Sequence, residues 1–205
     1  MSITNGYATL DEYKKWIVVR GGSAISTDAN DDAMIELLIE SVSRFIDAET
    51  ATKFYLPASD ETRYFTAVES DKVYVGFLAS LTSISVDYAG TRTYTDLTAT
   101  DYDLTPDNAS LDGVPYTAIE TNKQQSSAYF PRTRRGVKVV GKWGWPATPK
   151  DIKEATLSIA QSLYATRSGQ TAGGKVTITA GGIVIRPEDV PAFAQKVIMH
   201  YRNIL

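Results

Sequence analysis

The stretch from Gly169 to Lys175 is the part of the sequence closest to a known catalytic motif. It reads GQTAGGK and matches the first seven positions of a phosphate-binding P-loop. A P-loop continues with Ser or Thr, which holds Mg²⁺, and it lies between a strand and a helix. Here Val176 comes next, a predicted helix precedes the stretch and a strand-like run follows it. Since neither the magnesium ligand nor the helix dipole is available, we interpret the stretch as a glycine-rich loop and expect no cofactor.

Aspartates are dense in the middle of the chain. Five lie within 17 residues: Asp96, Asp101, Asp103, Asp107 and Asp112. A glycosidase needs two carboxylates facing each other across a cleft, and Ca²⁺ needs oxygen ligands around a tight loop. The run from Asp101 to Asn108 lacks the central glycine and the closing glutamate of an EF-hand loop. We interpret these aspartates as solvated turn residues and expect no metal site.

The run PRTRRG at residues 131–136 is the only dense basic segment. Its arginines, Arg132, Arg134 and Arg135, lie at the tip of a predicted hairpin, with Tyr129, Phe130, Trp143 and Trp145 near them in the sequence. They could contact DNA phosphates in a channel, weakly and without sequence preference. Contact with a neighbouring subunit fits equally well, because residues 1–56 carry nine acids against five bases. The sequence therefore leaves three interpretations of this run open: contact with DNA, contact with a neighbouring subunit, and a solvated loop.

The residue types that most nucleophilic chemistry needs are scarce. The chain has no cysteine and a single histidine, His200, which excludes cysteine nucleophiles, zinc fingers, iron–sulfur clusters and histidine-based triads. His200 lies beside Tyr201 on a predicted helix, with no serine or carboxylate tied to it by spacing. We therefore expect no catalytic residues, and a protein that is not an enzyme.

The overall composition is that of a globular protein. Of the 205 residues, 43% are hydrophobic and 22% charged, and the net charge of −3 argues against a general nucleic-acid binder. No apolar run approaches the roughly 18 residues of a membrane span, and the first residues lack the apolar core of a signal peptide. We expect a soluble protein made in the cytoplasm, with no membrane partner.

Helices are predicted in the first and last thirds of the chain. Thr9 and Glu12 have capping-box spacing ahead of a helix that carries Tyr13, Trp16 and Ile17 and ends at 21–22. A second helix begins at 26–28 and stops near 50–52. Its apolar stripe is wide, which predicts burial on more than one side: Met34, Ile35, Leu37, Leu38, Ile39, Val42, Phe45 and Ile46. A third helix begins with Thr148 as N-cap and Pro149 at its first position, and its helical pattern ends at 168–169.

Residues 54–147 have a different pattern, in which short β-rich runs alternate with turn residues. The expected strands are residues 63–66, 72–75, 83–86, 93–94, 116–119 and 137–140. This pattern predicts a compact antiparallel β module of about six strands. The fold class expected is therefore α+β, with the module inserted into a helical core formed by 1–53 and 148–168.

Residues 169–205 are predicted to form a flexible arm followed by a helix. Runs at 176–179 and 183–185 suggest a hairpin, and Pro187 opens the last helix. Its stripe is the cleanest in the chain: Val190, Phe193, Ala194, Val197, Ile198, Tyr201, Ile204 and Leu205. An amphipathic helix on an arm can dock into a groove on a partner. Packing of this helix inside one monomer is the other interpretation.

Taken in order, these segments resemble the head–tail connector (adaptor) proteins of tailed bacteriophages. The resemblance covers most of residues 7–167 and rests on the order and spacing of ordinary capping and core residues. Its segments are Thr9–Trp16, Asp32–Thr50, Phe54-Tyr55, Arg63–Phe65, Leu81–Tyr94, Asp101–Pro106, Gly113–Tyr116, Val139–Trp145 with Pro149, and Ile152–Tyr164. The arm and the last helix match in general layout only.

The resemblance implies a structural virion protein at the head–tail interface, made in the bacterial host. Family members form a ring of about twelve subunits beneath the portal protein, extend the DNA channel and present a platform to the next connector or tail protein. The C-terminal region of the family commonly contacts the portal. For this chain that implies docking through Val190, Phe193, Ala194, Val197, Ile198 and Tyr201.

Two alternatives come from the residues themselves. The β module could bind a ligand such as a carbohydrate by stacking it on Trp143, Trp145, Tyr94 and Tyr102. An enzyme using Asp101 and Asp103, which would share one face of a strand, has no partner acid or cofactor motif to support it.

Overall fold

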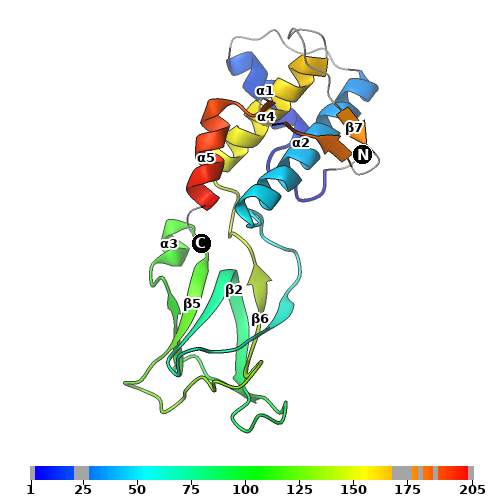
Figure 1. Ribbon diagram of the computed structural model, residues 1–205. Helices are drawn as coiled ribbons and strands as arrows, with labels where there is room; N and C mark the ends of the chain where they lie inside the picture. Colours follow the sequence, from blue (N-terminus) through cyan, green and yellow to red (C-terminus); the bar gives the residue numbers. More distant parts are fainter. Residues whose placement is uncertain (1–2, 21–27, 168–176, 180–181, 187–188, 203–205) are drawn as a thin grey trace. The chain divides into compact units, whose positions relative to one another are not determined.

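The computed structural model describes residues 3–20, 28–167, 177–179, 182–186 and 189–202, and divides the chain into two compact units (Figure 1). The helical unit comprises residues 1–52 and 148–205, and the sheet unit comprises residues 53–147. The described residues form five helices and a six-stranded antiparallel sheet, which confirms the α+β class. The P-loop-like stretch at 169–175 lies outside the described residues. No helix of the described part is long and apolar enough to cross a membrane.

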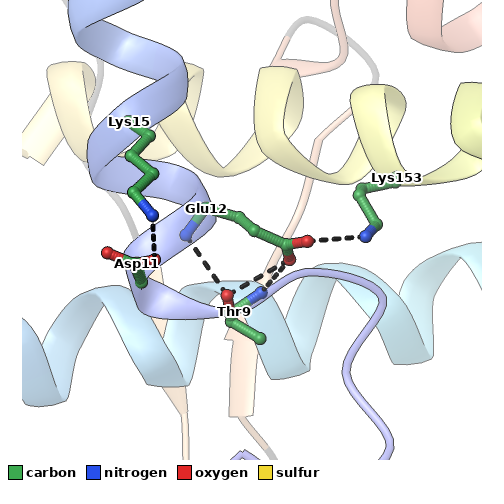
Figure 2. A network of polar contacts seen from close by, with 5 residues as sticks. All are labelled: Thr9, Asp11, Glu12, Lys15 and Lys153. Atoms are coloured by element: carbon green, nitrogen blue, oxygen red, sulfur yellow. Dashed lines mark hydrogen bonds and ion pairs between the residues drawn. The ribbon is translucent and has the colours of Figure 1, made fainter.

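Helix α1 (Leu10–Val19) begins with the predicted capping box, drawn in Figure 2. The Glu12 amide donates to the Thr9 hydroxyl at 3.2 Å, and the Glu12 carboxylate accepts from the Thr9 amide at 2.8 Å. The same carboxylate pairs at 2.6 Å with Lys153 of α4 (Lys150–Arg167). Burial raises the pKa of Glu12, but the hydrogen bonds from Lys153 and Thr9 outweigh this effect and lower the pKa below its ordinary value. One side chain thus starts α1 and links it to α4.

Helix α2 (Ala29–Thr50) begins where its acidic start predicts. The Asp28 carboxylate accepts hydrogen bonds from the amides of Asn30 and Asp31 at 2.8 and 2.9 Å. The helix packs against both α4 and α5 (Ala192–Arg202), so the wide apolar stripe is needed inside the unit. Its buried apolar residues are Ile35, Leu38, Ile39, Val42 and Ile46.

The later elements of the helical unit differ in detail from the prediction. Helix α4 begins one residue later than expected, because the Lys153 amide donates to the carbonyl of Pro149 and Lys150 is the first helical residue. Strands β7 (Thr177–Thr179) and β8 (Gly182–Val184) pair antiparallel, as the predicted hairpin requires. Helix α5 begins at Ala192, and Pro187 lies outside the described residues.

The sheet unit is built on β2, which pairs with three other strands. Its elements are β1 (Glu61–Phe65), β2 (Lys72–Val86), β3 (Thr95–Asp96), β4 (Tyr102–Thr105), α3 (Ala109–Asp112), β5 (Tyr116–Thr121) and β6 (Val137–Trp143). The strand order is β1-β6-β2-β5-β4, and β3 pairs with the end of β2. A buried cluster fills the unit: Ala67, Val73, Val75, Leu78, Ile84, Val86, Ile119, Phe130, Val137, Val139 and Trp143.

Three predictions within the sheet unit were wrong. The runs at 72–75 and 83–86 are one 15-residue strand, β2, with irregular pairing between them. Residues 102–105 form β4, although they were interpreted as turn residues. The expected strand at 93–94 lies instead at Thr95–Asp96, and the short helix α3 was not predicted.

Candidate functional site

The aspartates of the middle segment serve the local structure of the sheet unit. Asp96 on β3 accepts from the Ser85 hydroxyl at 2.7 Å, and Asp101 accepts from the Thr98 amide at 2.6 Å. Hydrogen bonds from Ser126 and Thr98 lower the pKa of Asp101, so its carboxylate stays ionised. Asp103 is exposed on β4. The described residues contain no group of three or more acidic or histidine side chains that could hold a metal ion.

Burial removes the two tryptophans from the carbohydrate site that the sequence suggested, so the structure gives that alternative no support. Trp143 and Trp145 are only 2% and 7% exposed, so neither offers a face for a sugar to stack on. Trp143 packs on Phe65, and Trp145 packs on Phe54 and Phe77. Phe130, which the sequence placed near the arginines, is also fully buried. These aromatic residues hold the core of the sheet unit.

The arginines of the basic run do meet a second loop. We call this surface the arginine tip and define it as residues 87–94, which follow β2, and 129–136, which precede β6. Figure 1 shows the two loops at the same end of the sheet, in green and yellow-green. The rings of Tyr88 and Tyr129 pack with their centroids 4.9 Å apart, and the Asp87 amide donates to the Gly136 carbonyl at 2.8 Å. The two loops therefore form one surface.

Arg92 and Arg135 fix the geometry of the arginine tip. Both have left-handed backbone conformations, with φ of 69° and 59°. The Arg92 guanidinium donates to the carbonyl of Arg134 at 2.7 Å, and the Tyr94 hydroxyl donates to the carbonyl of Arg135 at 2.8 Å. The Arg135 guanidinium also lies 4.2 Å from the centre of the Tyr64 ring. These contacts order the backbone that carries the basic run.

Asp87 is the one acid within the two segments of the arginine tip. Its side chain is buried and accepts from the backbone amides of Thr91 and Arg92 at 3.1 and 2.7 Å. Burial raises the pKa of Asp87, but these amide hydrogen bonds outweigh it and lower the pKa below its ordinary value. The carboxylate is thus used in shaping a loop. The exposed charge of the tip is carried by Arg92, Arg132, Arg134 and Arg135.

Sequence reasoning missed half of the arginine tip. Arg92 and Arg134 are 42 positions apart, and a single basic residue in a loop gives no signal by itself. The turn residues Ala89-Gly90 predict a loop after β2, but they do not indicate which other loop it contacts. Only the pairing of β2 with β6 brings the two loops together.

The predicted docking face of the last helix is mostly used within the helical unit. Val190, Ala194, Val197, Ile198 and Tyr201 are buried, since α5 packs on α2 and α4. The Tyr201 hydroxyl donates to Asp151 at 3.0 Å, and Arg202 pairs with Glu49 at 3.7 Å. Burial and the neighbouring carboxylate raise the pKa of Tyr201, which therefore stays protonated as a donor. These five residues therefore fit the second interpretation of the helix, which is packing inside one monomer.

Phe193 is the exception among the six, with 49% of its surface exposed. It borders an open groove of about 400 Å³ that is also lined by Trp16, Val19, Arg20, Glu154 and Ser158. Val19 is 85% exposed. His200 is exposed on the same helix, and its ring contacts the edge of Tyr201. This groove is one apolar surface that α5 offers while it remains packed, and a second groove of about 340 Å³ lies beside Val190, Ile198 and the exposed Met199.

The whole chain has the fold of known particle-neck chains. A chain from the "neck of empty GTA particle computed with C6 symmetry" aligns with a TM-score of 0.55 and 19% identity, over 98% of this chain and 92% of that chain. A chain from the neck of a native GTA particle, computed with C12 symmetry, aligns at 0.50 and 18% identity with the same coverage. A third, from the virion of a native gene transfer agent particle, aligns at 0.50 and 16% identity, again covering 98% and 92%.

Comparisons at the level of sequence find no match, either to a protein-family model or to a curated protein. The similarity to the neck chains extends over both units, including the C-terminal segment that resembled connectors only in layout. At the level of fold, it confirms the resemblance to head–tail connectors predicted from the sequence.

Proposed function

We propose that this chain is a structural component of the neck of a phage-like particle and acts as a head–tail connector. The observation that carries the proposal is the near-complete mutual coverage of this chain and the GTA neck chains. A shared domain would support only a shared module, whereas here both units follow in the same arrangement along the chain. The buried aspartate and tryptophan contacts of the sheet unit, which serve its structure, are consistent with a role without catalysis.

In this proposal the chain forms a ring of about twelve copies beneath the portal, where it extends the DNA channel and contacts the next connector or tail protein. The C6 and C12 symmetry of the similar necks supports a closed ring of identical subunits. The site of action is the head–tail interface of the virion, after synthesis in the host cytoplasm.

The C-terminal helix is our proposed contact with the portal. Since five of its six docking residues are buried, docking with α5 in place uses Phe193 and the adjacent groove beside Trp16 and Val19. Use of Val190, Ala194, Val197, Ile198 and Tyr201 would require α5 to leave α2 and α4 and to break the bond between Tyr201 and Asp151. The groove offers the apolar side chains of Trp16, Val19 and Phe193 to a partner, beside the polar Arg20, Glu154 and Ser158.

Light scattering after size exclusion tests the ring. The chain has a mass of 22.4 kDa, so a twelve-membered ring has a mass of about 270 kDa. We expect the amount of this species to increase with protein concentration, or the species to form when the portal protein of the same particle is added. A monomer at every concentration, both with and without the portal, would contradict the proposal.

A further inference from the structure

The arginine tip has a charge opposite to that of the chain that carries it. Its two segments contain four arginines and one aspartate, whereas the whole chain has a net charge of −3. All four arginines are exposed, and the single aspartate is buried beneath the backbone amides it accepts. Arg92 lies near Asp87 and Arg132 near Asp71, so two of the four charges are partly balanced, and the tip presents a net positive charge to solvent. Long-range repulsion among the four side chains would favour an anion between them.

Aromatic side chains surround these arginines. Tyr88 and Tyr129 are 40% and 48% exposed, and Tyr64 is 40% exposed beneath the Arg135 guanidinium. Lys138 adds a further cation 5.6 Å from the ring of Tyr94. Guanidinium forks bind phosphate oxygens in pairs, so the exposed arginines suit the phosphates of a nucleic-acid backbone, and Tyr64 and Tyr94 help to hold the cations Arg135 and Lys138 in place.

An acidic surface on a second copy of the chain is the competing partner. The acids of residues 1–56 are the ones that could receive the tip, but five of these nine are already in ion pairs within the chain. Those five are Asp11, Glu12, Asp32, Asp47 and Glu49. Asp28 is engaged in capping α2. Six of the nine acids thus already have a partner within the chain, which leaves fewer of them to receive the tip.

We infer that the arginine tip binds the phosphate backbone of duplex DNA, without sequence preference. The contact is electrostatic, so it weakens steeply with salt and depends on the number of phosphates neutralised. The inference concerns the surface of a single chain and stands whether or not the chain forms a ring.

Fluorescence anisotropy with the full chain and a labelled 30-base-pair duplex tests this inference. The variant R132Q/R134Q removes two exposed charges and leaves Arg92 and Arg135, which order the loops, in place. We expect the affinity at 50 mM salt to fall about tenfold, and the slope of log affinity against log salt to become shallower by about 1.8. Two duplexes of unrelated sequence should bind equally to the unaltered chain.

The matched control is K150Q/K196Q, which makes the same charge change at two exposed lysines of the helical unit. It should bind like the unaltered chain, and circular dichroism should show that both variants keep their fold. Equal losses in the two variants, or no loss in R132Q/R134Q, would overturn the inference. If R132Q/R134Q instead weakens self-association and leaves DNA binding unchanged, the tip contacts a second copy. A chain that binds DNA through the tip but stays monomeric at every concentration, with and without the portal protein, would contradict the ring alone.

Discussion

Asp87 shows how a single residue determines the shape of the arginine tip. Its carboxylate accepts the Thr91 and Arg92 amides, and its own amide donates to Gly136 in the other loop. The same carboxylate also lies close enough to Arg92 for the two charges to attract, which helps to lower the pKa of Asp87. Because Arg92 then holds the Arg134 carbonyl, the effect of Asp87 extends to the basic run.

The role of Asp87 predicts a pH-dependent effect of Asp87→Asn. Folding lowers the pKa of Asp87 below its ordinary value of 3.8, so the ionised group stabilises the folded state above that pH. The contribution is lost as the pH falls through the lowered value. At pH 7 we expect the midpoint of thermal unfolding to be several degrees lower for the variant than for the unaltered chain. This difference should shrink progressively below about pH 4.

Thermal unfolding followed by tryptophan fluorescence measures this effect, since Trp143 and Trp145 are buried in the sheet unit. Asp107→Asn makes the same charge change at an exposed loop position and should leave the midpoint unchanged. Equal midpoints for Asp87→Asn and the unaltered chain at pH 7 would show that the carboxylate does not order the loop.

At the scale of elements, local signals in the sequence predicted the starts of α1 and α2 and located β1, β5 and β6, but they failed for β2, β3 and β4. Thr9 with Glu12, and Asp28 ahead of α2, act on amides within three residues, so spacing alone identifies them. Strand β4 carries an exposed Asp103 between Tyr102 and Leu104, which pack against the core. That alternation was present in the sequence, but the surrounding aspartates and Pro106 were interpreted as a turn.

Strand β2 was predicted as two runs because Gly76, Ser80 and Thr82 lie between its two β-rich segments. Gly76 has a φ of 77°, and the pairing with β5 shifts beside it. The strand nevertheless continues, since its second half pairs with β6. Such long-range pairing leaves no local trace, which is also why the arginine tip was only half predicted.

The burial of α5 separates two kinds of apolar residue on one helix, and this predicts different effects of Phe193→Asp and Val197→Asp. Phe193→Asp should leave unfolding unchanged, because the side chain is half exposed, and should weaken portal binding about tenfold if the groove is the docking site. Val197→Asp should destabilise the helical unit by about 2–4 kcal/mol, because it buries a charge.

Met199→Asp is the comparison variant, since Met199 is an exposed apolar residue of the same helix that borders a second groove of about 340 Å³ with Val190 and Ile198. A loss of portal binding in Met199→Asp alone would place the docking site at that second groove. Denaturant unfolding and surface plasmon resonance against the portal protein measure the two effects. Unchanged portal binding by Phe193→Asp would remove the groove from the docking proposal.

At the scale of the whole molecule, two units of different architecture occur in one chain, and the sheet unit is an insertion between α2 and α4. The change in residue pattern near residues 53 and 148 was visible in the sequence, because helical periodicity gives way to short β-rich runs there. The likeness to particle-neck chains extends over both units at 16–19% identity. The chains therefore share the arrangement of their elements and differ in most of their residues.

The location of this chain in assembled particles tests the central claim most directly. Cryo-electron microscopy of purified particles, with a small rigid tag fused to the chain, would locate it against the head and the tail. The proposed connector function predicts tag density in a closed ring with sixfold or twelvefold symmetry at the head–tail junction. Tag density in the capsid shell or along the tail, or particles that lack the chain altogether, would contradict that function.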